Sequence, residues 1–297
     1  MSAAALPSPP GRSELRALLE VEGLRPSTRF GQNFLVDAAL LAAVPRDAGV
    51  LPGERVLEVG PGVGSLTVPL LEAGAAVLAV EVDHGLADLL RRRLAAPITE
   101  GRLGLVEGDV LDRDERFHPE VEAWWAAGPP PRVVSNLPYA ISGPFLARLP
   151  GRPLAGAALL LQREVADKAA GPRDAAGPWS PLSVRLRLGF TVRLGRRVPP
   201  EVFWPRPRVD SAFLHLEPRA DALPGPADAV LRAWLRVAFA ERRKRLLPRL
   251  ARRFPEAAAA LAAVGVGAEA RPEEVPPEPW AEALRQVVEW DAGEELE

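Results

Sequence analysis

The chain has no cysteine, only three histidines and no long apolar run. Without cysteine, a disulfide framework, a thiolate nucleophile and a thiolate metal site are all excluded. His84, His118 and His215 show no ligand spacing, so the sequence predicts no metal site. No stretch approaches the roughly eighteen apolar residues of a membrane-spanning helix, and the N-terminus lacks the basic and apolar parts of a secretion signal. We therefore expect a cytoplasmic protein with no membrane partner.

The charge balance is nearly neutral overall but very uneven along the chain. The net charge of the 297 residues is −2, yet residues 132–253 carry 23 basic and nine acidic groups. Residues 254–297 carry two basic and eleven acidic groups. Such asymmetry is typical of a protein that binds a polyanion such as RNA. The run Arg242, Arg243 and Lys244 is the densest candidate contact, although a solvated helix surface would have the same composition.

A glycine turn at residues 60–64 is the clearest structural signal. It follows an apolar strand and precedes a helix, an arrangement that brings backbone close to a nucleotide. The position that completes the dinucleotide fingerprint is Ser65, and no lysine cradles phosphates, so a nucleoside without phosphates fits better. Glu81 ends the next strand, 21 residues after Gly60, where a carboxylate accepts ribose hydroxyls. Asp109 follows a third strand and is placed to accept from an adenine amino group.

Residues 132–143 combine a buried strand with a turn that carries an amide and an aromatic ring. Asn136 is followed closely by Pro138 and by Tyr139, the only tyrosine of the chain. The amide oxygen, the proline carbonyl and the flat ring together suit a planar substrate ring with an exocyclic amine. The alternative is a β-turn with an incidental aromatic residue.

Two further loops combine aromatic and polar residues. Residues 30–35 place Asn33 between phenylalanines, which indicates a polar loop held over a ligand, and Leu35 ends it. Residues 203–211 place Phe203 and Trp204 beside Arg206 and Arg208 on a proline-rich loop. Aromatic rings beside arginines favour base stacking and phosphate binding. The alternative, favoured equally for Trp204, is that the aromatics anchor the loop to the core.

The alternation of strands and helices predicts an α/β fold with a second, all-helical part. We expect a disordered N-terminus at residues 1–12 and a nucleotide-binding domain at residues 13–222. Residues 223–226, Leu-Pro-Gly-Pro, are the best linker, and residues 227–297 then form a small helical domain.

Five motifs in this order resemble the rRNA adenine N6,N6-dimethyltransferase family of the bacterial small subunit. They are RFGQNFL (29–35), LEVGPGVG (57–64), NLPYAIS (136–142), PRVDSA (207–212) and AERRK (240–244). The resemblance runs from about residue 12 into the helical domain. It implies a class I S-adenosylmethionine methyltransferase fold with a Rossmann-like sheet, followed by a helical C-terminal domain. The implied cofactor-binding residues are Asn33, Leu35, Gly60, Glu81, Asp109 and Asn136.

The resemblance also implies a reaction and a partner. The substrate would be two adjacent adenosines near the 3′ end of 16S rRNA in the immature 30S subunit, dimethylated by a monomer without metal. Asn136 and the Pro138 carbonyl would accept the target amine's hydrogens while Tyr139 stacks on the ring. The implied RNA contacts are Phe203, Arg206, Arg208, Arg242, Arg243 and Lys244. Two alternatives are a macrolide-resistance methyltransferase of large-subunit rRNA and a non-catalytic RNA-binding assembly or transcription factor on the same fold.

Overall fold

The structure, a computed structural model, describes residues 5–27, 30–172 and 178–289. The chain divides into two compact units, each built from several segments. The first comprises Met1–Phe145, Pro153–Arg163 and Leu194–His215, and the second comprises Leu146–Arg152, Glu164–Arg193 and Leu216–Glu297. The linker predicted at residues 223–226 falls inside the second unit. A functional boundary at that linker stays a prediction.

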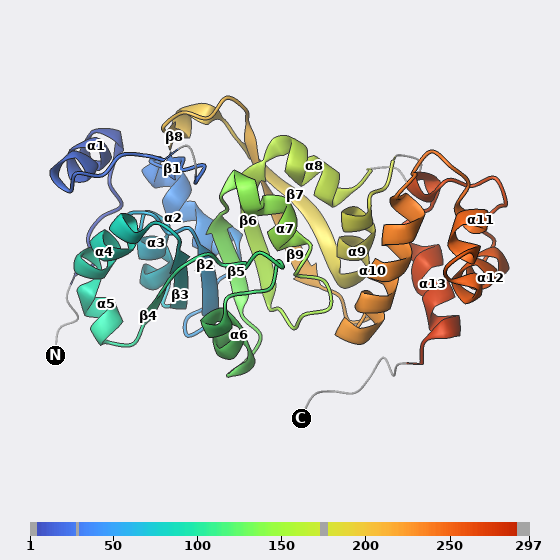
Figure 1. The fold of residues 1–297 in the computed structure, drawn as a ribbon. Coiled ribbons are helices and arrows are strands. Elements are labelled where there is room, and N and C mark those ends of the chain that lie inside the picture. The colour runs from blue at the N-terminus through green and yellow to red at the C-terminus, as the bar shows by residue number, and fades with distance from the viewer. Residues whose placement is uncertain (1–4, 28–29, 173–177, 290–297) are drawn as a thin grey trace. The chain divides into compact units, whose positions relative to one another are not determined.

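A seven-stranded sheet organises the fold, with the strand order β4-β3-β2-β5-β6-β9-β7 (Figure 1). The strands are β2 (Arg55–Val59), β3 (Ala76–Glu81), β4 (Leu103–Glu107), β5 (Arg132–Asn136), β6 (Gly156–Gln162), β7 (Phe190–Val198) and β9 (Ser211–Pro218). The strands β4, β3, β2, β5 and β6 pair in parallel. Because the chain reverses its direction of travel across the sheet at β2 and β5, the carboxyl ends of these two strands are the expected place for a ligand.

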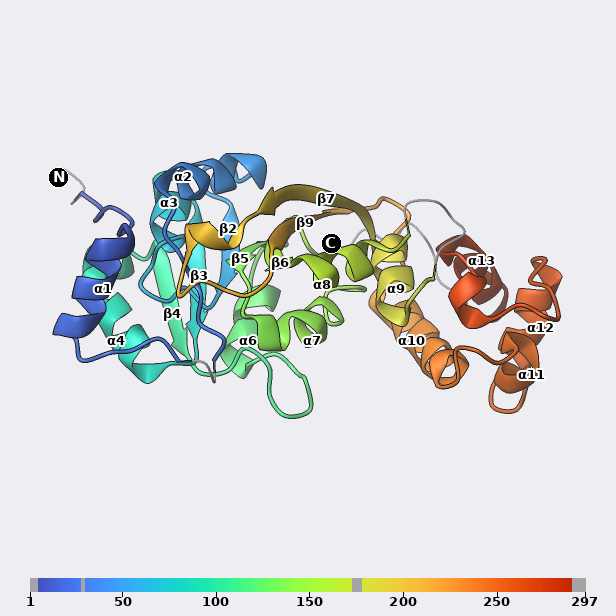
Figure 2. The same ribbon diagram turned by 90° about the horizontal axis from the view of Figure 1, so that it is seen from above.

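Helices pack on both faces of this sheet. They are α2 (Ala38–Asp47), α3 (Thr67–Glu72), α4 (His84–Arg93), α5 (Ala95–Thr99), α6 (Pro119–Ala126) and α7 (Ser142–Leu146), with α1 (Arg12–Val21) before them. Figure 2 shows α2 and α3 on one face and α6 and α7 on the other. The helix α2 begins after Asp37, whose carboxylate accepts the Leu40 N–H at 2.7 Å.

A two-stranded antiparallel sheet, which the sequence did not predict, joins two distant loops of the first unit. The strands are β1 (Phe34–Leu35) and β8 (Phe203–Trp204), with Phe34 opposite Trp204. The 3-10 turn η2 (Pro200–Val202) precedes β8, and its Val202 carbonyl accepts the Val36 N–H at 2.9 Å. The two aromatic loops noted in the sequence therefore form one structure.

The second unit is mainly helical. Its helices are α8 (Arg163–Ala170), α9 (Pro181–Gly189), α10 (Gly225–Phe239), α11 (Leu246–Ala251), α12 (Pro255–Ala263) and α13 (Pro277–Val287), with the turn η3 (Pro272–Glu274). Trp234 and Trp280 are fully buried in its core. A buried ion pair ties α9 to α10, because the Arg185 guanidinium donates to both carboxylate oxygens of Asp228 at 2.8 and 2.6 Å.

The predicted disorder of residues 1–12 is wrong for the described part of that segment. The Ser8 carbonyl accepts from the Arg93 guanidinium at 2.7 Å, and Leu6 packs against the main apolar cluster. Residues 1–4 lie outside the described residues. In the described part of the chain, no helix is both long and apolar enough to cross a membrane.

Candidate active site

The glycine turn after β2 is shaped by three residues with positive φ. Gly60, Gly62 and Gly64 have φ values of +69°, +59° and +87°, a region that residues with a side chain rarely adopt. A Cβ on Gly60 would lie 3.0 Å from Cγ of Pro138, and one on Gly62 would lie 2.8 Å from Cε1 of Phe34. Glycine is therefore needed here for close packing as well as for backbone geometry. The contacts bring the glycine turn, the asparagine-proline turn and the 30–35 loop together.

Glu81 is held at the carboxyl end of β3 by backbone amides. Its two carboxylate oxygens accept the N–H groups of Gly62 and Asp83, each at 2.9 Å, and only 3% of the residue is exposed. Burial raises the pKa of Glu81, and these amides partly offset the rise. The carboxylate is thereby fixed in orientation, and its remaining lone pairs are able to accept hydroxyl groups of a sugar.

The 30–35 loop is fastened by side-chain hydrogen bonds. Asn33 Nδ2 donates to the Gly31 carbonyl at 3.0 Å. Gln32 accepts the Ser27 N–H at 2.7 Å through Oε1 and donates to Asp83 at 3.1 Å through Nε2. Nothing in the local sequence indicates this role for Gln32, because its partner Asp83 is 51 residues away. It links the loop to the segment that follows Glu81.

Asn136 extends from the end of β5 with its amide already oriented. Its Nδ2 donates to the Asn33 carbonyl at 2.9 Å, so Oδ1 is the atom left to accept from a ligand. The Pro138 carbonyl, predicted as a second acceptor, already receives the Ile141 N–H at 3.2 Å and the Ser142 hydroxyl at 3.1 Å. Among the described residues, no hydrogen bond reaches the carbonyl of Leu137. Leu137 is therefore a second candidate acceptor that the sequence did not reveal.

Tyr139 is tethered to a strand 72 residues further along the chain. Its hydroxyl lies 2.9 Å from the Ser211 hydroxyl, and Ser211 is fully buried at the start of β9. Burial raises the pKa of Tyr139, and the Ser211 contact partly opposes the rise, so the phenol stays neutral at physiological pH. The tether fixes the ring and explains why the 207–212 motif accompanies the 136–142 motif.

These elements surround one cavity of about 310 Å³ in the first unit. The six residues predicted to bind a cofactor all line it: Asn33, Leu35, Gly60, Glu81, Asp109 and Asn136. Asp109 is held by the Leu111 N–H, which its carboxylate accepts at 3.2 Å. Among the described residues, the lining contains three carboxyl groups, those of Glu58, Glu81 and Asp109, and no cationic side chain. The cavity is thus suited to a ligand that carries positive charge.

Comparison with known families agrees with this geometry. The sequence profile of a family described as ribosomal RNA adenine dimethylase matches residues 23–287. The chain belongs to this dimethylase family. The match covers both compact units, so membership does not depend on the nucleotide-binding fold alone.

Two curated relatives that share one name align with most of the chain. The ribosomal RNA small subunit methyltransferase A of Leifsonia xyli is 41% identical over 280 residues, which cover 89% of this chain and 94% of that protein. The protein of that name from Magnetococcus marinus is 42% identical over 238 residues and covers 78% and 81% of the two chains.

Two solved structures have a similar fold. The 23S rRNA methyltransferase ErmE is 29% identical, with a TM-score of 0.63 over 86% of this chain and 99% of that one. A dimethyladenosine transferase from Plasmodium falciparum, 21% identical, shows the same fold with a TM-score of 0.61 over 85% and 96%. The predicted class I methyltransferase fold with a helical C-terminal part is confirmed.

Family membership makes S-adenosylmethionine the methyl donor, and the cavity fits this molecule. Its sulfonium and ammonium groups are cationic, which matches a lining of carboxyl groups without a basic side chain. The glycine turn leaves no room for a Cβ at Gly60 or Gly62, as expected where backbone approaches a nucleoside. Glu81 and Asp109 would bind the ribose and the adenine.

One predicted RNA contact is wrong and the others remain predictions. Phe203 is fully buried in the main apolar cluster, so its ring is not available to stack on a base. Its neighbour Trp204 is partly buried against a smaller cluster of the first unit. The remaining predicted contacts have exposed side chains: Arg206, Arg208, Arg242, Arg243 and Lys244. Of these, Arg206 contacts Glu201, and Arg242 lies 3.7 Å from Glu273.

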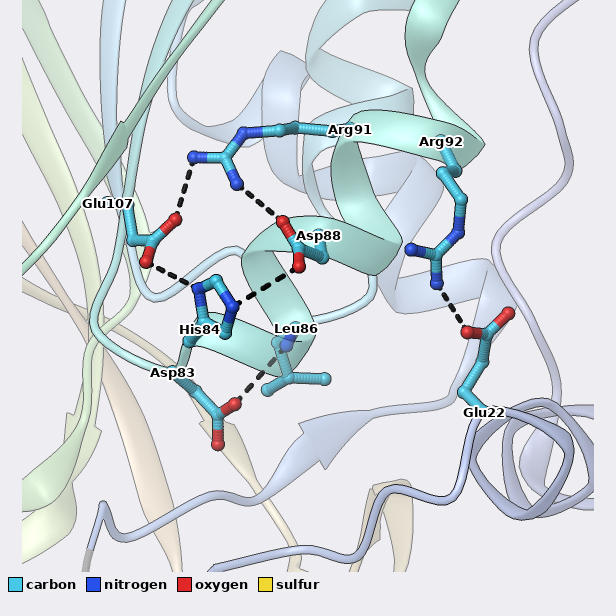
Figure 3. Close-up of polar contacts among 8 residues, drawn as sticks. All are labelled: Glu22, Asp83, His84, Leu86, Asp88, Arg91, Arg92 and Glu107. Carbon is cyan, nitrogen blue, oxygen red and sulfur yellow. Dashed lines mark hydrogen bonds and ion pairs between the residues drawn. The ribbon is translucent and has the colours of Figure 1, made fainter.

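A surface cluster on α4 and β4 also brings potential metal ligands together, against the sequence expectation (Figure 3). The His84 ring lies 2.6 Å from Glu107 and 3.4 Å from Asp88. Arg91 bonds both carboxylates, at 2.7 and 2.8 Å. The hydrogen bond to Glu107 raises the pKa of His84, while Arg91 and His84 lower that of Glu107. Because cations already neutralise both acids, the cluster is an exposed ion-pair network.

Proposed function

We propose that this protein transfers methyl groups from S-adenosylmethionine to the N6 amines of two adjacent adenosines near the 3′ end of 16S rRNA. The observation that carries the proposal is Asn136, whose Nδ2 is bound to the Asn33 carbonyl beside a cavity lined by carboxyl groups. This contact leaves an oriented amide oxygen to accept a hydrogen from an exocyclic amine. The relatives named for the small subunit support the choice of rRNA.

The chain's contribution to the chemistry is mainly positioning. An adenine amine is a poor nucleophile because its lone pair is conjugated with the ring. Asn136 Oδ1 and the carbonyl of Leu137 or Pro138 would hold its two hydrogens, which favours a pyramidal nitrogen with a localised lone pair. Tyr139, fixed through Ser211, would stack on the ring. When bound, S-adenosylmethionine supplies the electrophilic methyl group on its sulfonium.

No strong base is needed in this arrangement. The amine's proton can leave after the new bond forms, because the nitrogen is cationic at that point. The target adenine must leave its helix to reach the cavity, so weakly paired RNA is the favoured substrate. Repeating the reaction on the same nitrogen gives the dimethylated product.

RNA affinity would come mostly from phosphate contacts. We assign them to exposed cations of both units: Arg206, Arg208, Arg242, Arg243 and Lys244. Replacing Arg242, Arg243 and Lys244 by glutamine should reduce the slope of log affinity against log salt, since each phosphate contact adds about 0.7 to 0.9 to that slope. An unchanged slope would place the phosphate contacts elsewhere.

The cellular setting is also part of the proposal. We infer a monomeric cytoplasmic protein that acts on the immature 30S subunit during small-subunit biogenesis, without metal. The uneven charge along the chain, with 23 basic groups in residues 132–253, supports a polyanionic partner.

Transfer of tritiated methyl groups to purified ribosomal particles tests the proposed function. Unmethylated 30S subunits should accept label on two adjacent adenosines near the 3′ end of 16S rRNA, located by primer extension. Deproteinised 23S rRNA is the comparison substrate. Label on a 23S adenine would support the macrolide-resistance alternative, and absence of label on either RNA would support a non-catalytic role.

The cofactor assignment has its own test. Glu81→Ala removes the carboxylate that two backbone amides orient, so S-adenosylmethionine affinity measured by calorimetry should fall. Unchanged affinity would remove Glu81 from the binding site.

A further inference from the structure

A third carboxyl group in the cavity has no role in the assignments above. Glu58 lies on β2, two residues before Gly60, lines the cavity and is only 2% exposed. Among the described residues, its Oε2 atom has no hydrogen-bond partner. A buried carboxyl group without a partner is costly when ionised, so such a group keeps its proton or awaits a cation.

The groups around Glu58 do not supply that cation. Glu81 on the neighbouring strand β3 is the charge that acts on it, and this charge is negative. Asp109, after β4, and Tyr139, after β5, are the other titratable groups of the lining, and neither is cationic. Burial, helped by the Glu81 charge and partly opposed by the Thr67 hydroxyl, raises the pKa of Glu58 to about 8. In the free protein, Glu58 is therefore neutral at pH 7.

Two hydroxyl groups near the glycine turn also lack partners. Ser65 Oγ, in the cavity lining, and Thr67 Oγ1, at the start of α3, are buried without a hydrogen bond among the described residues. Thr67 approaches Glu58 but does not form a well-shaped hydrogen bond with it. Hydroxyl hydrogens rotate freely, so both groups are able to donate to a carboxylate that becomes ionised.

We propose that Glu58 is a proton-releasing counter-charge for the cationic end of S-adenosylmethionine: it is a neutral acid in the free protein and a carboxylate in the complex. The inference rests on the cofactor of the proposed function. The other two carboxylates are already committed, since Glu81 is bound by two amides and Asp109 by one. Of the three cavity acids, Glu58 is the one that receives no backbone N–H among the described residues, so its protonation responds most strongly to an incoming positive charge.

Calorimetry in two buffers measures this proton directly. S-Adenosylmethionine is titrated at pH 7 in phosphate and in Tris, and the difference in heat gives the number of protons released. A group with a pKa of about 8 that becomes fully ionised should release about 0.9 proton at pH 7. If the ligand's amino group binds as an ammonium, it takes up roughly 0.1–0.2 proton at pH 7, because its pKa is about 7.7–8.0, so the net release should be slightly smaller. 5′-Methylthioadenosine, which has the adenine and ribose but no cationic group, should release almost none.

Variants identify the source of the proton. Glu58→Gln copies the neutral acid, so proton release should be lost and S-adenosylmethionine affinity should fall about ten- to a hundredfold. Glu72→Gln, an exposed change on α3, is the matched control and should keep both values. If Glu58→Gln does not fold, the wild-type profile still tests the linkage below pH 8, because Glu58 releases a proton there whereas the ligand's amino group, with a pKa of about 7.7–8.0, only takes one up.

The outcomes separate this inference from the proposed function. Binding of S-adenosylmethionine to the wild type without proton release, or with a release unchanged in Glu58→Gln, would overturn the role of Glu58 alone. A wild-type profile with no net proton release below pH 8 would do the same. Absence of any binding of S-adenosylmethionine would overturn the proposed cofactor, and with it the function.

Discussion

Replacing Asn136 is the most direct test of the proposed chemistry. In Asn136→Ala, two things are lost: the Oδ1 acceptor and the 2.9 Å hydrogen bond that holds the Asn33 carbonyl. Removing one oriented partner of a reacting group typically lowers kcat by about 10²–10³, or roughly 2.7–4 kcal/mol of transition-state stabilisation. RNA affinity should change little, because no phosphate contact is assigned to this turn.

Asn136→Asp is the informative companion. It keeps an acceptor oxygen but replaces the donor by a second oxygen, which then faces the Asn33 carbonyl instead of bonding it. The side chain should rotate away from its present position, and activity should fall although an acceptor remains. If the reaction needed only an acceptor oxygen, Asn136→Asp would stay active. This variant therefore tests whether the orientation of the oxygen matters.

Single-turnover methyl transfer to unmethylated 30S subunits is the appropriate assay. Asn136 also lines the cofactor cavity, so its replacement should weaken cofactor binding. Saturating S-adenosylmethionine removes that effect from the measured rate. Subunit affinity is measured separately by filter binding. If Asn136→Ala keeps a single-turnover rate close to that of the wild type, the assignment of the amide oxygen as acceptor is wrong. A proportionate loss of subunit affinity would indicate instead that the turn binds RNA.

Three further predictions concern fixed side chains. Tyr139→Phe keeps the ring but loses the Ser211 contact, so stability should fall by only about 0.5–1.5 kcal/mol in urea denaturation and methyl transfer should persist. Asp228→Ala leaves the Arg185 charge buried without its partner, which should cost about 3–5 kcal/mol in the same assay, whereas replacing both by leucine should be far milder. Burial raises the pKa of Glu58 to about 8, so the folded state keeps a proton that the unfolded chain has already released. The stability of the fold therefore falls as pH rises from the ordinary carboxyl pKa to 8. Between those limits, wild-type stability should fall by up to about 1.4 kcal/mol per pH unit more steeply than that of Glu58→Gln.

Local patterns predicted the parts of the site that are continuous in sequence. The glycine turn, Glu81 and the Asn136 turn each follow a short apolar strand, and parallel strands bring their carboxyl ends to one edge. Their arrival in one cavity followed from that rule and from the family resemblance. The strand that carries Asn136, β5, ends at Asn136 itself.

Contacts between distant segments were not predictable in the same way. Nothing local indicates that Tyr139 bonds Ser211 or that Gln32 bonds Asp83, because these pairs are 72 and 51 residues apart. The β1–β8 sheet was missed since each strand has only two residues. Phe203 lies in one of these short strands, so the local sequence did not decide whether its ring enters the core or faces a ligand.

Glu58 shows a different limit of sequence reasoning. It occupies one position of an apolar strand, where a charged residue is usually explained by an exposed face. Only the three-dimensional surroundings, with Glu81 nearby and no cation in the described lining, reveal a buried acid that keeps its proton. The informative feature was therefore the absence of a partner, which no spacing rule reports.

The cofactor cavity and the predicted RNA contacts differ in the sign and the burial of their charged groups. The cavity holds three carboxyl groups, two of them nearly inaccessible to water, and would receive a small cationic ligand. The predicted RNA contacts, by contrast, are exposed arginines and a lysine. Salt screens exposed charges over about 10 Å at 0.1 M but affects buried pairs much less. RNA affinity should therefore depend steeply on salt while cofactor affinity depends mainly on pH, because the charge that matters inside the cavity is set by a proton and not by counter-ions.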